Sequence, residues 1–243
     1  MSVPRAHHYE GDKNLSAMAL MGRYNQWIYD TIAPHLSHSI LEAGCGNGNL
    51  TRFIVSTPGL KRYAGVDLSE TFCRQLEDEI RFLPGCSGEF HAMDLQSAAL
   101  ERLGAVPFST IVCSNVLEHL ADDVEVLRRF HRVLEPRGKV VLQVPAIQWL
   151  YGSIDEVDQH HRRYSRKQLR SALELAGFSI VDVFYFNFLG IAAWIWHGKI
   201  RKHKTHPVDD MRAWDRWVPI LRAAESLLPL PVGLSLFAIG EKR

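Results

Sequence analysis

The sequence predicts an α/β protein with a doubly wound, mostly parallel sheet. Short apolar runs alternate along the chain with segments whose apolar residues recur at helical spacing, a pattern typical of βαβ units. A glycine-rich turn follows the first apolar run, at the strand end where sheets of this class bind ligands. The 243 residues, 47% of them apolar, suffice to bury one large domain or two small ones.

The elements can be placed in order along the chain. Residues 14–34 have helical spacing and end at Pro34, which cannot continue a helix. Seven strands are expected, at 39–43, 62–66, 88–93, 109–114, 138–144, 178–186 and 234–240. Helices are expected between them at about 48–56, 69–82, 96–102, 122–134 and 165–176. The last two end before Pro136 and at Gly177, which are ordinary helix stop signals.

Charge and cysteine content limit the partners and the compartment. The formal net charge of +1 gives no global field for nucleic acid, so we expect no nucleic-acid partner. Four cysteines without a CxxC pair or metal-ligand spacing indicate reduced thiols in a cytosolic protein. The N-terminus lacks the apolar core of a signal peptide. The longest nearly apolar run, 183–196, has 14 residues, fewer than the roughly 18–20 that a spanning helix needs.

The stretch ILEAGCGNGN at 40–49 predicts a close approach of backbone to a ligand. Its glycines stand at Gly44, Gly46 and Gly48, and Asn49 occupies the position of the last glycine in a dinucleotide fingerprint. No Gly-Lys-Ser/Thr follows, which excludes a P-loop. The acid Glu42 precedes the turn.

Two further acids follow the next two predicted strands. Asp67 lies 19 residues after Gly48, where a carboxylate can accept hydrogen bonds from both hydroxyls of a ribose. Asp94, after the third strand, suits the exocyclic amine of a base. The alternative interpretation is that both acids only cap the helices that follow them.

These residues resemble the class I S-adenosylmethionine-dependent methyltransferases, and more their small-molecule branch (type 11/12-like) than the nucleic-acid methylases. The resemblance covers about residues 38–186 and rests on five ordered motifs: E-x-G-C-G-x-G at 42–48, GVDLS at 65–69, MDL at 93–95, NVLEHL at 115–120 and LEPRGKVVLQVP at 134–145. It implies a Rossmann-like sheet of seven strands, mostly parallel with the last strand antiparallel, and helices on both faces.

The resemblance also implies a cofactor, S-adenosylmethionine, with S-adenosylhomocysteine as product. Gly44, Gly46 and Gly48 would cradle its methionine part and Glu42 would orient that loop. Asp67 would bind the ribose, and Asp94 the adenine amine. Further residues implied to line the cofactor are Leu68, Leu95, Asn115, Val116 and, from the N-terminal helix, Tyr24.

Candidate groups for catalysis and acceptor binding follow the fourth and fifth strands. His119 has a pKa range suited to general-base work, and its alternative role is packing. In IDEVDQHHRRYS at 154–165, His160 and Tyr164 are further catalytic candidates, and the alternative is a solvated loop of Arg–Asp pairs. We expect Glu118, Arg163, Trp149 and Trp194 to contact the acceptor. A metal site from Asp155, Asp158 and His160 is conceivable, but we expect no metal.

A segment of 47 residues, 187–233, separates the last two predicted strands. The chain is therefore divided into an N-terminal helical lid (1–37), a cofactor-binding core (38–186), a helical insert that caps the substrate pocket (187–233) and a final core strand (234–243). Tryptophans beside Lys199, Arg201, Lys202 and Lys204 suggest peripheral membrane contact through 187–204. The alternative is a helical cap packed on the sheet, with its basic residues in water.

The function that the sequence favours is methyl transfer from S-adenosylmethionine to a small-molecule or lipid-linked acceptor, by in-line displacement at the sulfonium methyl group. The acceptor atom is left open among oxygen, nitrogen and carbon. One alternative is a non-catalytic module that binds the cofactor. Another is an NAD-dependent oxidoreductase, against which Asn49 argues.

Overall fold

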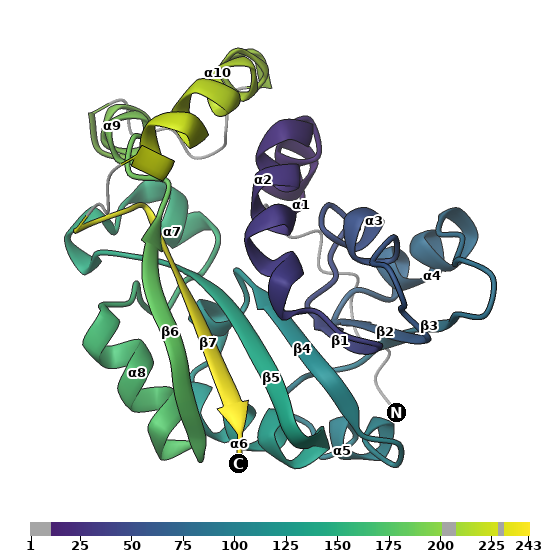
Figure 1. Cartoon of the computed structure of the whole chain (residues 1–243). Coiled ribbons are helices and arrows are strands. Elements are labelled where there is room, and N and C mark those ends of the chain that lie inside the picture. The colour runs from purple at the N-terminus through teal and green to yellow at the C-terminus, as the bar shows by residue number, and fades with distance from the viewer. Residues whose placement is uncertain (1–10, 201–207, 228–230) are drawn as a thin grey trace, which may run out of the picture.

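The computed structural model describes residues 11–200, 208–227 and 231–243 (Figure 1). Seven strands form one sheet in the order β3-β2-β1-β4-β5-β7-β6. β7 pairs antiparallel with both β5 and β6, and the other pairs are parallel, as expected. The strands are β1 (Ser39–Ala43), β2 (Arg62–Asp67), β3 (Ser87–Ala92), β4 (Phe108–Ser114), β5 (Leu134–Pro145), β6 (Phe178–Phe186) and β7 (Ser235–Lys242).

Helices cover both faces of the sheet, because the central strands are apolar on both sides. One apolar cluster joins the sheet to α2, α3 and α4, and a second joins it to α5, α6 and α8. The helices are α1 (Gly11–Met18), α2 (Gly22–Ile32), α3 (Thr51–Ile54), α4 (Glu70–Glu79), α5 (Leu100–Leu103), α6 (Asp123–Val133), α7 (Ser153–Val157), α8 (Arg166–Leu175), α9 (Gly190–Trp194) and α10 (Val208–Leu227). A π-helical turn, Ile195–Ile200, follows α9.

Several element boundaries differ from the sequence prediction, three of them near the site. The N-terminal helix is broken between α1 and α2 instead of running continuously over 14–34. The helix expected at 48–56 is a single turn, α3, because the glycine loop continues to its start. β5 begins at Leu134, before the expected residue 138, and Arg137 adopts a positive φ of 64° beside the irregular pairing with β4.

The described parts of the segment 187–233, namely residues 187–200, 208–227 and 231–233, lie at the edge of the sheet where the parallel strands end. Figure 1 shows α9 and α10 beyond that edge, with α10 beside α2. Glu225 of α10 accepts hydrogen bonds from the backbone N–H groups of Asn187 (3.0 Å) and Phe188 (2.6 Å), which ties the beginning of the segment to its last helix. The N–H of Leu234 donates to the carbonyl of Asn187 and closes the segment at its other end.

α10 also supplies the N-terminal cap of α2. Met21 offers no side-chain cap, and the carboxylate of Asp215 takes that place by accepting hydrogen bonds from the backbone N–H groups of Tyr24 (3.0 Å) and Arg23 (3.3 Å). Arg222 of α10 pairs with Asp30 at the other end of α2. A carboxylate at a helix N-terminus satisfies free N–H groups and interacts favourably with the helix dipole. The break in the N-terminal helix is thus stabilised by a residue far away in the sequence.

We therefore expect Asp215→Ala to weaken the contact between α2 and α10. Loss of the cap should lower the free energy of unfolding by about 0.5–2 kcal/mol. Hydrogen exchange at the amides of Arg23 and Tyr24 should become faster. The control is Asp78→Ala, which removes an exposed carboxylate from α4. Unchanged exchange at these two amides in the Asp215 variant would show that the cap contributes nothing.

Candidate active site

The glycine loop between β1 and α3 is held in backbone conformations that suit glycine. Gly44, Gly46 and Gly48 have φ values of 82°, 51° and 82°. A Cβ atom on Gly44 would lie 2.2 Å from Cγ2 of Val116, so this part of the loop packs directly on the turn after β4. The N–H groups of Gly44 and Cys45 donate to the carbonyl of Val66, which fixes the loop to β2. At Gly44 the backbone approaches the Val116 side chain, and the approach of this loop to a ligand stays a prediction.

Asp67 lies at the end of β2 and faces this loop. Its Oδ2 accepts a hydrogen bond from the N–H of Gly46 (2.8 Å), and its Oδ1 accepts one from the N–H of Ser69 (2.9 Å). Ser69, and not Asp67, is the N-cap of α4, since its hydroxyl accepts from the N–H of Phe72. Each carboxylate oxygen can accept a second hydrogen bond, so Asp67 can also bind ribose hydroxyls.

The second predicted acid lies on the same edge of the sheet. Asp94 follows β3 and is exposed, and its Oδ1 accepts a hydrogen bond from the N–H of Gln96 (2.8 Å). Leu95 beside it is buried, whereas Leu68 after β2 is 75% exposed. Asn115, after β4, is exposed with a φ of 52°. These residues surround the glycine loop on neighbouring strand ends, as parallel strands require.

Glu42 lies beneath the loop and not on its open side. Its Oε2 accepts hydrogen bonds from the hydroxyls of Tyr63 (2.5 Å) and Thr51 (2.9 Å), and the residue is 3% exposed. Burial raises the pKa of the Glu42 carboxyl from 4.5 to about 7, against the lowering effect of these two hydrogen bonds. Glu42 is therefore placed to position the loop from behind, through the first turn of α3.

The raised pKa of Glu42 predicts that stability falls as the pH rises. The folded state holds the proton more tightly than the unfolded chain, so this contribution is fully present below about pH 4.5 and is lost as the pH rises through 7. The largest loss is roughly 3 kcal/mol. Urea denaturation between pH 5 and 8 should therefore show a slope that Glu42→Gln flattens. A slope retained in full by the variant would assign it to other groups.

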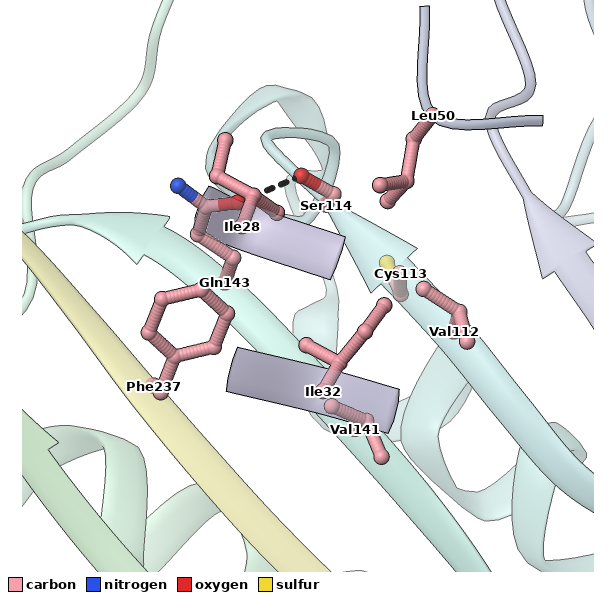
Figure 2. Close-up of a pocket in the computed structure, with 9 residues that line it drawn as sticks. All are labelled: Ile28, Ile32, Leu50, Val112, Cys113, Ser114, Val141, Gln143 and Phe237. Atoms are coloured by element: carbon pink, nitrogen blue, oxygen red, sulfur yellow. Dashed lines mark hydrogen bonds between the residues drawn. The ribbon is translucent and has the colours of Figure 1, made fainter. Parts of the chain in front are cut away.

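α2 packs closely on the carboxyl ends of β4 and β5. Figure 2 shows the residues at this contact, which include Ile28 and Ile32 of α2 and residues of the strands, with the hydroxyl of Ser114 donating to Gln143 Oε1 (2.8 Å). The gap between them has no room for a water molecule, whereas typical ligand pockets have about 300–1,000 Å³. We therefore expect ligands at the open strand edge and not beneath α2.

A buried ion pair organises the segment after β5. Asp155 and Arg163 are 0% and 1% exposed, and Arg163 Nε donates to Asp155 Oδ1 (2.9 Å). His160 Nδ1 lies 2.8 Å from the same oxygen. Burial alone would raise the pKa of Asp155, but His160 and Arg163 outweigh it and hold that pKa below its ordinary value. Arg163 also donates to the carbonyl of Ala146 (3.2 Å). Its guanidinium is thus used to hold the loop together.

Glu118 and the two predicted catalytic histidines meet beside this ion pair. The rings of His119 and His160 lie edge to face with centroids 4.6 Å apart, and His160 Nε2 is 3.9 Å from Glu118 Oε1. Burial raises the pKa of Glu118 to about 7 and lowers that of His119 to about 4. Burial lowers the pKa of His160, but hydrogen bonding to Asp155 and the charge of Glu118 raise it overall.

The remaining predicted residues are placed differently. Tyr164 is 2% exposed and its hydroxyl donates to Asp123 Oδ2 (2.7 Å), so it anchors the segment to α6, and burial raises its pKa. Tyr24 is buried, and its hydroxyl accepts from Asn187 (3.4 Å) at the contact with the insert. Trp194 covers the Arg163 guanidinium at 4.2 Å, whereas Trp149 is 65% exposed.

Sequence reasoning missed two acids that organise this region. Asp155, in the stretch 154–165, was considered only as a metal ligand or as part of a surface ion pair. Its burial could not be predicted, because the stretch around it is rich in charged residues. Asp215 lies in the insert and had no sequence signal at all, because its partners are the backbone N–H groups of α2.

Comparison with known proteins matches a family described as "Methyltransferase domain" to residues 16–183. The tRNA U34 carboxymethyltransferase of Vibrio parahaemolyticus serotype O3:K6 is 30% identical over 174 residues, which cover 65% of this chain and 51% of that protein. The enzyme of the same name from Idiomarina loihiensis is 25% identical over 213 residues, covering 84% and 61%. The chain spans about half the length of most of the curated relatives that it matches.

Solved structures share the fold at low sequence identity. An S-adenosylmethionine-dependent methyltransferase from Archaeoglobus fulgidus aligns with a TM-score of 0.61 and 17% identity, covering 96% of this chain and 97% of that one. A chain from the complex between the Haloferax volcanii Trm112 methyltransferase activator and a methyltransferase aligns with a TM-score of 0.61 and 16% identity, covering 94% and 95%.

The relatives correct the predicted partners. Their named substrate is a tRNA, so the prediction that excluded a nucleic-acid partner is wrong. The physical reason is that a net charge of +1 describes the whole chain and says nothing about how its charges are distributed. No finding supports the peripheral membrane contact that was predicted for residues 187–204. Arg201, Lys202 and Lys204 lie outside the described residues, and no helix in the described part of the chain is long and apolar enough to cross a bilayer.

The family match also decides between the broad classes of function. It covers the glycine loop, both strand-end acids and the turn after β4, and it favours a methyltransferase over an NAD-dependent oxidoreductase. The chain therefore belongs to the class I S-adenosylmethionine-dependent methyltransferase family and is an enzyme that uses S-adenosylmethionine as its methyl donor.

Proposed function

We propose that this enzyme methylates RNA, and that tRNA is the class of RNA to test first. The observation that carries the proposal is a basic patch at the edge of the site, which we define as Arg166, Lys167 and Arg170 on α8. All three residues are exposed. The tRNA-modifying relative from Idiomarina loihiensis aligns over 84% of this chain, a share that has to include the patch.

The patch lies at the N-terminal end of α8, directly after Tyr164 and the buried ion pair. The first turn of α8 contains no acidic residue. The positive end of the helix dipole therefore lies beside two basic side chains. These like charges repel one another, and a bound phosphate would relieve the repulsion. Phosphate contacts by Lys and Arg supply most of the affinity of proteins for nucleic acid. A local patch of this kind compensates for the small net charge of the whole chain.

The residues that would hold the cofactor fit its chemistry. S-adenosylmethionine, when bound, supplies an electrophilic methyl group. We propose that Gly44, Gly46 and Gly48 receive its amino-acid part, that Asp67 accepts hydrogen bonds from the ribose, and that Asp94 accepts one from the adenine amine. The left-handed glycine backbone and the position of Asp67, whose carboxylate contacts the N–H of Gly46, support this assignment. The chain's own task is to orient the acceptor and exclude water.

We further propose that the segment 187–233, together with α2, caps the acceptor side of the site. Trp194 supports this role, because its ring covers Arg163 and its Nε1 donates to the carbonyl of Leu150 (3.0 Å). The cap of α2 by Asp215 joins the insert to the N-terminal lid. His119 and His160 stay the predicted catalytic residues, and Tyr164 acts through its anchor to Asp123.

Transfer of the labelled methyl group of S-adenosylmethionine to purified tRNA tests the acceptor. We expect incorporation into tRNA, and nucleoside mass spectrometry distinguishes a methyl from a carboxymethyl product. The double variant Arg166→Glu/Lys167→Glu should raise KM for tRNA about tenfold or more and reduce its salt dependence, with kcat retained.

A matched control reverses two exposed charges elsewhere, in Lys61→Glu/Arg74→Glu. It should leave KM for tRNA unchanged. Calorimetry with S-adenosylmethionine is run on the same samples. A protein that binds the cofactor but labels neither tRNA nor total RNA overturns the RNA proposal and leaves the cofactor assignment intact.

A further inference from the structure

We propose that Glu118, His119 and His160 bind one divalent cation of the first transition row. The three residues come from two turns at the same edge of the sheet. Glu118 and His119 belong to the 3-10 turn Leu117–His119 after β4, and His160 lies in the segment between α7 and α8. One ligand atom of each residue lies within 4.8 Å of the others.

Glu118 is the strongest indication of a missing ligand. Its side chain is 0% exposed, and neither carboxyl oxygen accepts a hydrogen bond from any residue in the described parts of the chain. The imidazole nitrogen His160 Nε2 lies 3.9 Å from Glu118 Oε1, beyond hydrogen-bond distance. A buried carboxyl group without hydrogen bonds costs free energy unless a partner compensates it, and metal coordination is one such compensation.

His160 is oriented as metal-binding histidines are. Its Nδ1 lies 2.8 Å from Asp155 Oδ1, and this hydrogen bond places the ring proton on Nδ1 and leaves the lone pair of Nε2 directed at Glu118. Asp155 is itself fixed by Arg163 and by the N–H of Gly152 (2.9 Å). A carboxylate–histidine pair of this kind raises the ligand basicity of the histidine.

The donor set indicates the class of metal. One carboxylate oxygen and two imidazole nitrogens suit zinc, iron, cobalt or manganese better than calcium or magnesium, which prefer oxygen ligands. Metal–ligand bonds of about 2.1 Å place two donors at most about 4.2 Å apart. Ligand atoms that lie within 4.8 Å of one another therefore have to move closer together when the cation binds. Three protein ligands leave coordination positions open to a further molecule.

This site differs from the one that the sequence made conceivable. The set of Asp155, Asp158 and His160 is unsuitable because Asp155 is committed to the buried ion pair. In its place, the turn after β4 contributes two ligands from a position next to Asn115 and Val116. The role of the cation in the reaction rests on the proposed function. There the cation would bind an oxygen of the RNA acceptor and lower the pKa of that oxygen group.

Titration of metal-free enzyme with Co²⁺ tests the site without RNA or cofactor. We expect one equivalent to bind and to produce visible d–d absorption bands typical of mixed nitrogen and oxygen ligands. Glu118→Gln, which keeps the side-chain shape, and His119→Ala should each weaken binding about tenfold or more. His161→Ala replaces an exposed histidine next to the cluster and should bind Co²⁺ as the unchanged protein does.

Binding of less than one equivalent by the unchanged protein overturns the proposal. So does binding that Glu118→Gln and His119→Ala leave unaltered. Circular dichroism on the same samples shows that the variants are folded. Because tRNA takes no part in the titration, failure of the RNA proposal does not affect its outcome.

Discussion

Arg163→Met is expected to destabilise the protein by about 3–5 kcal/mol, because it leaves the buried carboxylate of Asp155 without its strongest partner. Arg163 is 1% exposed and Asp155 0%. The substitution also removes the hydrogen bond to Ala146 and the contact with Trp194. The free energy of unfolding in urea measures this effect.

The neighbouring residue provides a matched control. Arg162 pairs with Asp123 at 3.0 Å, but its side chain is 29% exposed. Solvent screens such a pair, so Arg162→Met should cost at most about 1 kcal/mol. Equal costs for the two variants would contradict the buried ion pair as the organiser of the segment after β5.

Gly44→Ala is expected to abolish binding of S-adenosylmethionine. The new Cβ atom would lie 2.2 Å from Cγ2 of Val116, and alanine is strained at a φ of 82°. The strain alone costs about 1–3 kcal/mol. The steric overlap must also displace the loop or the turn after β4, which are the two segments expected to hold the cofactor. Calorimetry should show affinity reduced at least about a hundredfold, since small displacements of a binding backbone have large effects.

Gly59→Ala separates strain from steric overlap. Gly59 has a φ of 78°, close to that of Gly44, but a Cβ atom there would have no neighbour within 4 Å. It lies before the amino end of β2, away from the site. This control should lose stability and keep cofactor affinity. If it lost cofactor binding as fully as Gly44→Ala, the close packing on Val116 would not explain the effect.

Much of the cofactor half of the site could be predicted from the sequence, because its residues follow directly after strands. Asp67, Asp94 and the glycine loop each stand at the carboxyl end of an apolar run, and parallel strands bring such ends to one edge. The acceptor half could be located only coarsely. Arg163 and Tyr164 were predicted to line the acceptor pocket. In the structure Arg163 pairs with Asp155, and Tyr164 donates a hydrogen bond to Asp123.

The sequence by itself determined the fold class, because alternating apolar runs and helical segments are a local pattern. Its ordered motifs indicated the methyl donor through their resemblance to a known family. Only the tertiary structure decided which charged groups are buried and which residues they pair with. Asp215 caps a helix 191 residues away from it in the chain. Glu118 is a buried carboxyl group without a hydrogen bond in the described parts of the chain. Burial and long-range pairing depend on the packing of distant segments, and no local pattern encodes them.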